Sequence, residues 1–371
     1  MFQSFEEKTY KSLIKPILFN FDPETVHELM LSFGEISPNI PIFNNYLKSV
    51  HSKKFKNLNQ KIKNINFDLP IGLSAGFDYE AKLTQALPLL GFGFGTIGTI
   101  TNNAYIGNQK PRLARLPKSK SLLVNKGFKN NGIDRILLKL KNHNFSIPIG
   151  ISIGRTNTPL FKNLTEAIQD IKTSFKKIEN SNINFSYYEL NISCPNLNGN
   201  IDFYRPQNLK KLLTEIDNIK LKKPLFIKMP INNSDNDQLK MLKIISQSKA
   251  IGVIYGNLQK DRTNNSFDKS EIKNATKGNF SGLPTQKRSN ELISMCYKKF
   301  GKRFIIVGCG GVFTATDAYE KIKNGATIIQ MITGLIYNGP QVVAQINKEL
   351  SFLIKKDGYK SISEAIGKNI N

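Results

Sequence analysis

The chain has 371 residues, a formal net charge of +25 and three cysteines. Its length suits one α/β barrel with an extension, and three scattered cysteines exclude a disulfide framework and favour a reducing compartment. Lysine is spread along the whole chain, so the charge indicates a compositional bias rather than a nucleic-acid-binding patch.

No stretch approaches the about 20 apolar residues of a membrane-spanning helix. The N-terminus carries Glu6 and Glu7 instead of the apolar run of a secretory signal. The sequence contains no cluster of cysteine or histidine residues of the kind that would predict a metal site.

Residues 1–60 are predicted to form a separate helical extension. Apolar residues from Phe2 to Leu18 recur at helical spacing, and Pro16 predicts a kink or break. Asp22 and Pro23 predict the start of a second helix, which Gly34 is expected to end. The apolar stripes of these helices either pack on the main domain or form a lid that lies on a membrane or guides a lipophilic substrate. The pattern by itself favours packing.

Residues 61–371 are predicted to form one (β/α)8 barrel of the α/β class. Short apolar runs end in Gly, Asn, Ser or Thr, as expected of parallel strands that are buried on both faces. Eight such units over about 280 residues match the size of a barrel. The runs are Ile71–Gly76, Phe94–Ile100, Ile147–Gly154, Tyr188–Ser193, Leu225–Met229, Ile251–Asn257, Phe304–Gly308 and Thr327–Gly334.

Helical segments are expected between most of these strands and after the last one. Two connections are longer than usual, at 101–131 and 257–284, and long loops at the C-terminal face of a barrel usually carry function. The expected helices are Glu80–Leu90, Gly132–Lys141, Leu164–Glu179, Asn208–Ile219, Asp235–Ser246, Gln286–Phe300, Ala315–Asn324 and Pro340–Lys355.

A thiol lies in the polar turn after the fourth predicted strand. Cys194 stands between Asn191 and Asn196 and is followed by Pro195. The C-terminal end of a barrel strand is where catalytic groups are placed, so Cys194 is a candidate base. The alternative is a buried structural cysteine, since free cysteine is among the most buried residue types.

Other strand ends carry residues that suit a phosphate and a flat polar ring. Gly310 and Gly311 after strand seven, and Thr333 and Gly334 after strand eight, predict backbone N–H groups around a phosphate, although tight turns would explain the glycines equally. Lys228 ends strand five, where it either pairs with a carboxylate or stabilises negative charge on a ring.

Three asparagines complete this pattern. Asn191, Asn196 and Asn257 are expected to converge on the barrel mouth, where their amides can donate to and accept from a heterocycle. Each one, taken separately, is more typical of a turn residue.

With these motifs the chain resembles the dihydroorotate dehydrogenases, FMN-containing barrels of pyrimidine biosynthesis. The N-terminal segment around Phe21–Glu28 resembles the extension of the membrane-associated class that uses quinone, which favours the lid interpretation. The motifs that carry the resemblance are Gly72–Gly76, Gly91–Gly95, Gly107–Arg112, Gly127–Asn130, Asn191–Asn196, Ile227–Lys228, Gly308–Gly311 and Thr333–Gly334.

The resemblance implies a reaction and a place in the cell. A base removes a proton from dihydroorotate while a hydride passes to FMN, and quinone then reoxidises the flavin to leave orotate as product. Cys194 would be the base and Lys228 would stabilise the reduced flavin. The enzyme would lie peripherally on the cytoplasmic side of the inner membrane, bound through the N-terminal helices, with no nucleic-acid partner. The implied FMN contacts are Ala75, Gly76, Thr99, Ser152, Asn191, Lys228, Gly282, Gly310, Gly311, Thr333 and Gly334, and the implied substrate contacts are Asn191, Asn196, Asn257 and Asn125.

Several positions depart from the family pattern. The quinone class usually has serine at position 194, whereas cysteine is typical of the other classes; an electropositive site is expected to lower the pKa of this thiol. Tyr79 replaces a lysine that touches flavin and substrate, so a cation for the substrate carboxylate is lost. Val124 stands where an asparagine usually binds substrate, which Asn125 replaces only with a shift of one residue. Leu258 and Ser152 also differ from the family residues.

These departures leave two alternatives to a dihydroorotate dehydrogenase. One is a paralogous FMN barrel that acts on another ring or ene substrate. The other, suggested by the net charge, is an RNA-binding flavoprotein, against which the short tail after Gly334 argues because such proteins carry a helical RNA-binding domain there.

Overall fold

The computed structural model describes residues 5–199, 201–301 and 303–370, so the first four residues of the predicted extension lie outside it. Eight parallel strands close into a barrel in the order β10-β12-β13-β3-β4-β7-β8-β9. All eight predicted strands are present, which confirms the fold class. Their bounds are β3 (Ile71–Leu73), β4 (Phe94–Ile100), β7 (Ile149–Ile153), β8 (Tyr187–Asn191), β9 (Leu225–Met229), β10 (Gly252–Tyr255), β12 (Ile305–Cys309) and β13 (Ile328–Met331).

Most predicted barrel helices are also present, within a few residues of their expected bounds. They are α5 (Ile133–Leu140), α6 (Leu164–Asn180), α7 (Pro206–Asp217), α8 (Asp235–Ser246), α10 (Gln286–Phe300), α11 (Ala315–Lys323) and α13 (Val342–Lys356), joined by α12 (Thr333–Asn338) and α14 (Ile362–Ala365). The prediction of a helix over residues 80–90 was wrong. The carboxylate of Asp78 accepts hydrogen bonds from the backbone N–H groups of Lys82 and Leu83, both at 2.8 Å, and Ala81 adopts φ +55°. This turn leaves only a short 3₁₀ segment, Leu87–Leu90.

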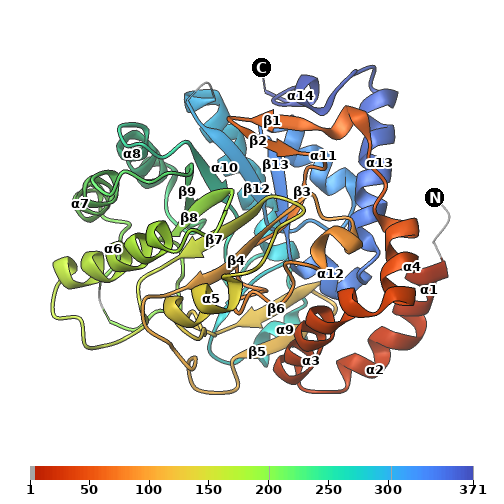
Figure 1. Cartoon of the computed structure of the whole chain (residues 1–371), viewed down its shortest axis with the longest axis horizontal. Coiled ribbons are helices and arrows are strands. Elements are labelled where there is room, and N and C mark those ends of the chain that lie inside the picture. Colours follow the sequence, from red (N-terminus) through yellow and green to blue (C-terminus); the bar gives the residue numbers. More distant parts are fainter. Residues whose placement is uncertain (1–4, 200, 302, 371) are drawn as a thin grey trace.

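The two long connections form a second sheet that the sequence did not predict. Strands β5 (Leu113–Leu116) and β6 (Ser121–Val124) lie in the first loop, and α9 (Lys269–Lys273) and β11 (Asn279–Phe280) lie in the second. The three strands pair antiparallel in the order β11-β6-β5. This sheet lies at one end of the barrel, and the hairpin of β1 (Gln60–Ile62) and β2 (Ile65–Phe67) lies at the other (Figure 1).

The N-terminal helices lie beside the β5–β6 end of the barrel (Figure 1). Helix α1 (Phe5–Thr9) continues through a π-helical turn into α2 (Lys15–Phe19), so no break occurs at Pro16. The backbone N–H of Lys15 donates to the carbonyl oxygen of Tyr10, five residues earlier, which is the hydrogen-bond spacing of a π-helical turn. Such a turn lets the helix continue past a local disruption. Helix α3 (Pro23–Ile36) begins where predicted, because the Asp22 carboxylate caps the N–H of Thr25 at 2.8 Å. It continues two residues past Gly34, and α4 (Pro41–His51) follows.

Helix α3 buries a different face from the one expected. Of the predicted apolar stripe of Val26, Leu29, Met30 and Phe33, the last three are exposed and Val26 is partly buried, while Glu24 and His27 are buried together with Leu31. Packing of this stripe on the main domain, which the periodicity alone favoured, is therefore contradicted for most of α3, and the lid interpretation that the resemblance favoured stays a prediction. The helix meets the barrel through Leu31 together with charged and polar groups, and most of its predicted apolar stripe stays exposed.

Candidate active site

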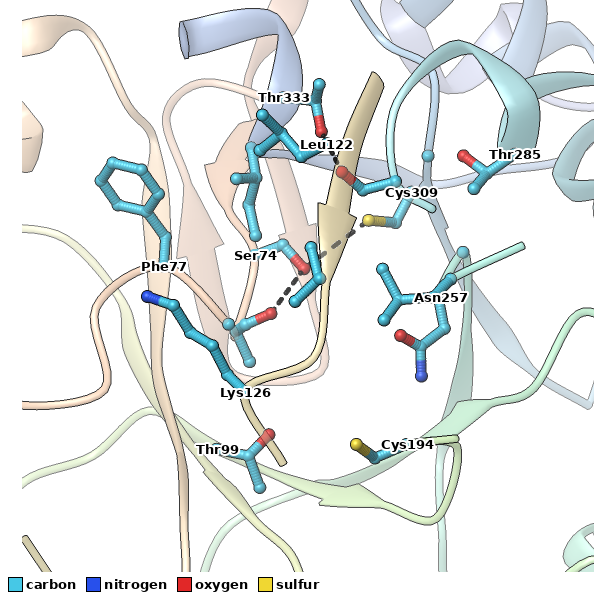
Figure 2. Close-up of a pocket in the computed structure, with 18 of the residues that line it drawn as sticks. Ser74, Phe77, Thr99, Leu122, Lys126, Cys194, Asn257, Thr285, Cys309 and Thr333 are labelled. Atoms are coloured by element: carbon cyan, nitrogen blue, oxygen red, sulfur yellow. Dashed lines mark hydrogen bonds between the residues drawn. The ribbon is translucent and has the colours of Figure 1, made fainter. Parts of the chain in front are cut away.

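A cavity lies at the C-terminal ends of the barrel strands, bounded by the β5–β6–β11 sheet and by α3 and α12. Thr99, Cys194 and Asn257 project into it from different elements (Figure 2). Two predicted site residues, Ser152 and Asn125, are not among its lining residues. The predicted residues that do line it are Ala75, Gly76, Thr99, Asn191, Cys194, Asn196, Lys228, Asn257, Gly282, Gly310, Gly311, Thr333 and Gly334.

Cys194 lies in the turn after β8, with its thiol partly buried in the cavity wall. Burial raises the pKa of this thiol to about 11, although the Asn196 N–H and the positive charges of Arg155 and Lys228 act in the opposite direction. The expectation that the site lowers this pKa was therefore wrong, because loss of solvation outweighs the nearby charges. Arg155, which the sequence analysis missed, is 3% exposed, and its Nε has no hydrogen-bond partner among the described residues.

Asn191 is fixed at the end of β8 by a network of hydroxyl groups. Its amide nitrogen donates to Thr99 Oγ1 at 2.7 Å, and its amide oxygen accepts from the hydroxyl of Ser193 at 2.8 Å. Thr99 in turn contacts Ser152 Oγ at 3.0 Å, and Ser152 donates to Glu189 Oε1 at 2.7 Å. Ser152 thus stands one layer behind the cavity, where it holds Thr99 in place.

Lys228 is a buried cation at the end of β9. Its ammonium donates to Ser74 Oγ at 3.0 Å and to the carbonyl of Ala75 at 3.2 Å. Glu189 Oε1 lies 3.7 Å from the ammonium and balances its charge. Glu189 was not predicted as a site residue, although a carboxylate within an otherwise apolar strand was a usable signal.

The other two asparagines hold the cavity wall together. Asn196 donates from its amide to Val124 O at 3.0 Å and accepts from Asn279 at 2.6 Å. Asn257 donates to the hydroxyl of Ser193. Each amide retains unused hydrogen-bonding capacity, because it carries two N–H groups and two oxygen lone pairs. Asn125, by contrast, accepts from Asn108 at 3.0 Å behind the wall.

The glycine turns lie in the second long loop and after β12, where a Cβ at Gly310 would lie 3.6 Å from Gly256 Cα at the end of the neighbouring strand β10. Gly282, Gly310 and Gly311 all adopt positive φ, and a Cβ at Gly282 would lie 2.3 Å from Lys120 O. Thr333 begins α12, and its hydroxyl contacts the hydroxyl of Ser281 at 2.9 Å.

These residues fit a flavin mononucleotide. Backbone turns and two hydroxyl groups offer donors suited to a phosphate, while Thr99, Asn191 and Lys228 offer donors and a positive charge suited to the polar edge of a flavin ring. Apolar side chains such as Met331 and Ile332 also line the cavity and suit the flat face of a ring.

The N-terminal helix α3 contributes directly to the cavity. His27 lines it, and one turn away the buried Glu24 carboxylate accepts from Arg112 Nε at 2.8 and 2.9 Å. Burial opposes ionisation of Glu24, but the Arg112 hydrogen bond and the surrounding cations hold its pKa below the usual value. In the sequence, Arg112 and His27 stand out only as members of motifs, and no signal points to Lys126, which lines the cavity next to His27.

Comparison with known proteins agrees with this geometry. The family model for dihydroorotate dehydrogenase matches residues 57–354. A dihydroorotate dehydrogenase (quinone) of Christiangramia forsetii is 36% identical over 92% of this chain and 98% of its own length. One of the same name from Sulfurimonas denitrificans is 36% identical over 95% of this chain and 97% of its own.

Solved structures show the same architecture. The crystal structure of Eimeria tenella DHODH in complex with ferulenol superposes with a TM-score of 0.82 at 25% identity, covering 94% of this chain and 96% of that one. The ligand-free form gives a TM-score of 0.83, covering 94% and 100%. Fold, strand-end residues and sequence similarity agree, and the chain belongs to the dihydroorotate dehydrogenase family, in which its curated relatives are of the quinone type.

Proposed function

We propose that this chain binds FMN in the barrel-mouth cavity and oxidises dihydroorotate to orotate in pyrimidine biosynthesis, with quinone as the electron acceptor. The observation that carries the proposal is the meeting of Cys194, Lys228 and three asparagines in one cavity with the glycine turns of β12 and the start of α12. Family membership and the names of the relatives support the same reaction.

In this reaction Cys194 accepts a proton from the carbon next to a ring carbonyl. Its thiol is protonated at neutral pH, so only a small thiolate fraction is available as a base. The amides of Asn191, Asn196 and Asn257 orient the ring through its N–H and C=O groups. FMN, when bound, would supply the two-electron hydride acceptor for this step. Lys228 holds a positive charge where negative charge develops on reduction.

The acceptor is proposed to approach from the apolar part of the cavity. Leu113 and Leu122 of the small sheet, and Ile336 of α12, line this part. A lipophilic quinone suits such walls, and the N-terminal helices would then act as its guide.

A paralogous activity on another ring remains a second candidate because Tyr79, Val124 and Leu258, three departures from the family pattern, all line the cavity. One experiment separates the two. The purified chain is expected to carry FMN, to change its flavin spectrum on addition of orotate, and to oxidise dihydroorotate faster with quinone than with fumarate or NAD. An unchanged spectrum at millimolar orotate would reject dihydroorotate as the substrate and favour the paralogue.

The exposed apolar surface of the N-terminal helices supports peripheral membrane contact. No helix of the described residues is long and apolar enough to cross a membrane. A peripheral helix buries one apolar face in the lipid headgroup region instead. The exposed apolar side chains are Phe5, Leu13, Ile17, Phe21, Leu29, Phe33, Ile36 and Ile42.

We therefore expect the chain to sediment with lipid vesicles and a Leu13→Asp, Ile17→Asp, Ile42→Asp variant to stay in the supernatant. These three side chains are at least 60% exposed, so the variant should keep its thermal midpoint within a few degrees. Binding of both proteins to neutral vesicles to the same extent would contradict contact through this face. An Ile106→Asp variant is a matched control, because Ile106 is 86% exposed but lies outside the N-terminal helices.

A further inference from the structure

Three lysines line the cavity, and they differ in what neutralises them. Lys228 has Glu189 at 3.7 Å, and Lys129 pairs with Glu24 and Glu28. Within the described residues Lys126 makes no ion pair, although only 9% of it is exposed. A buried ammonium without a counterion is costly unless a ligand supplies the negative charge.

The partners of Lys126 are neutral. Its Nζ lies 3.2 Å from His27 Nδ1 and 3.3 Å from the Tyr79 hydroxyl, and 4.8 Å from the centre of the Tyr79 ring. The other ring nitrogen of His27, Nε2, lies 2.9 Å from the carbonyl oxygen of Phe77. A carbonyl only accepts, so Nε2 carries the proton and Nδ1 accepts from Lys126. Burial and the charge of Lys126 hold the pKa of His27 well below its usual value, which keeps the imidazole neutral.

Lys126 also lies on the segment that forms the substrate end of the cavity. It follows β6 by two residues, and Val124 at the end of β6 accepts from the Asn196 amide. Its side chain extends toward Phe77, which lies close to the strand end of β3 (Figure 2). Tyr79, the position where the family pattern has a lysine, is in contact with the Lys126 ammonium.

We propose that Lys126 is the cation that binds the carboxylate of dihydroorotate and orotate, and that His27 of the N-terminal helix α3 positions it. The positive charge that position 79 lacks is thereby supplied from the segment that follows β6, with Tyr79 as its support. This assignment rests on the proposed function. His27 is a positioning residue, because it acts through Lys126.

Binding of orotate, compared with uracil, tests this assignment. Uracil has the same ring without the carboxylate, so the pair isolates the contribution of the negative charge. Lys126→Met is expected to weaken orotate binding about 10- to 100-fold, as for loss of a charged hydrogen bond, and to leave uracil binding nearly unchanged. Dissociation constants come from the flavin absorbance change, and flavin content reports whether the variant folds. Lys129→Met is the matched control, since its ammonium already has carboxylate partners, and should change orotate affinity less than about twofold.

A pH series with Lys126→Arg gives a second test that does not depend on removing the charge. Burial lowers the pKa of Lys126 to about 8, with Lys129 and Arg112 acting in the same direction and Glu24 and Glu28 against it. Wild-type affinity for orotate should therefore fall as the pH rises through about 8, while affinity for uracil should not. The arginine variant stays charged over this range, so its orotate affinity should not fall there.

The outcomes separate this assignment from the proposed function. If the wild-type chain does not bind orotate, the function itself fails and the assignment fails with it. If the wild type binds orotate and Lys126→Met binds it equally well, only the assignment is overturned. A change in the KM for quinone without a change in orotate affinity would also overturn it and place Lys126 with the acceptor.

Discussion

Flavin reduction by dihydroorotate is expected to slow by about 10²- to 10⁴-fold in a Cys194→Ala variant, the usual range for loss of a general base. FMN should remain bound, because the glycine turns and hydroxyl groups proposed to hold the phosphate lie on other strands. The measurement is the rate of flavin bleaching in an anaerobic stopped-flow experiment at saturating dihydroorotate. Saturation removes the effect of Lys126 on substrate affinity from the observed rate.

The pH dependence of this rate should identify the base. With the pKa of the Cys194 thiol raised to about 11, the thiolate fraction and the wild-type rate should rise about tenfold per pH unit through the neutral range. Cys194→Ala should lose this dependence. Cys296→Ala is the matched control, because that cysteine is buried in the hydrophobic core and does not line the cavity. A wild-type rate that does not change with pH would reject Cys194 as the base.

A Glu24→Ala variant should loosen helix α3 from the barrel and reduce quinone-dependent turnover strongly. The substitution leaves the buried Arg112 guanidinium without its carboxylate, and breaking a buried ion pair from one side costs about 3–5 kcal/mol. That energy exceeds what the small apolar contact of α3 can offset, so amide hydrogens of α3 should exchange faster. Turnover with a small water-soluble dye should fall less than turnover with quinone, because the dye does not need the apolar walls.

Glu28→Ala provides the comparison for Glu24. It removes a carboxylate one turn further along the same helix, but its side chain is 52% exposed, so the expected cost is at most about 1 kcal/mol. The pKa of Glu24 in the folded chain lies below its usual value of 4.5. The Glu24–Arg112 ion pair therefore stabilises the fold fully above about pH 4.5, and this stabilisation is lost as the pH falls through the folded-state pKa. Equal hydrogen exchange in the two variants would show that the Glu24–Arg112 pair does not hold α3.

The barrel could be predicted from the sequence because its strands are buried on both faces and therefore appear as apolar runs. For α3, in contrast, the helical spacing of apolar residues did not predict which face of the helix is buried. Most of its apolar stripe is exposed, and the buried face is held by Glu24 and His27, whose partners Arg112 and Lys126 lie 88 and 99 residues further along the chain. Period alone cannot tell which face of a helix meets the protein.

The candidate site shows the same limit. Cys194, Lys228 and the asparagines could be selected because they stand at strand ends. Lys126 could not, because its surroundings arise when α3, the turn after β3 and the end of β6 meet in space. The raised pKa of Cys194 was missed for a related reason, since it depends on how completely the folded wall excludes water from the thiol.

The small sheet over the barrel mouth has a consequence for the order of folding. Its strands β6 and β11 come from the loops after β4 and β10, which stand four positions apart in either direction around the eight-stranded ring. Val124 therefore pairs with Asn279 across the full diameter of the barrel. Closing so large a loop for so few hydrogen bonds is unfavourable until the ring itself has brought the two sides together. The wall that carries Lys126 must form after barrel closure, so a partly folded chain with an open ring has no complete binding site and gains no stability from substrate.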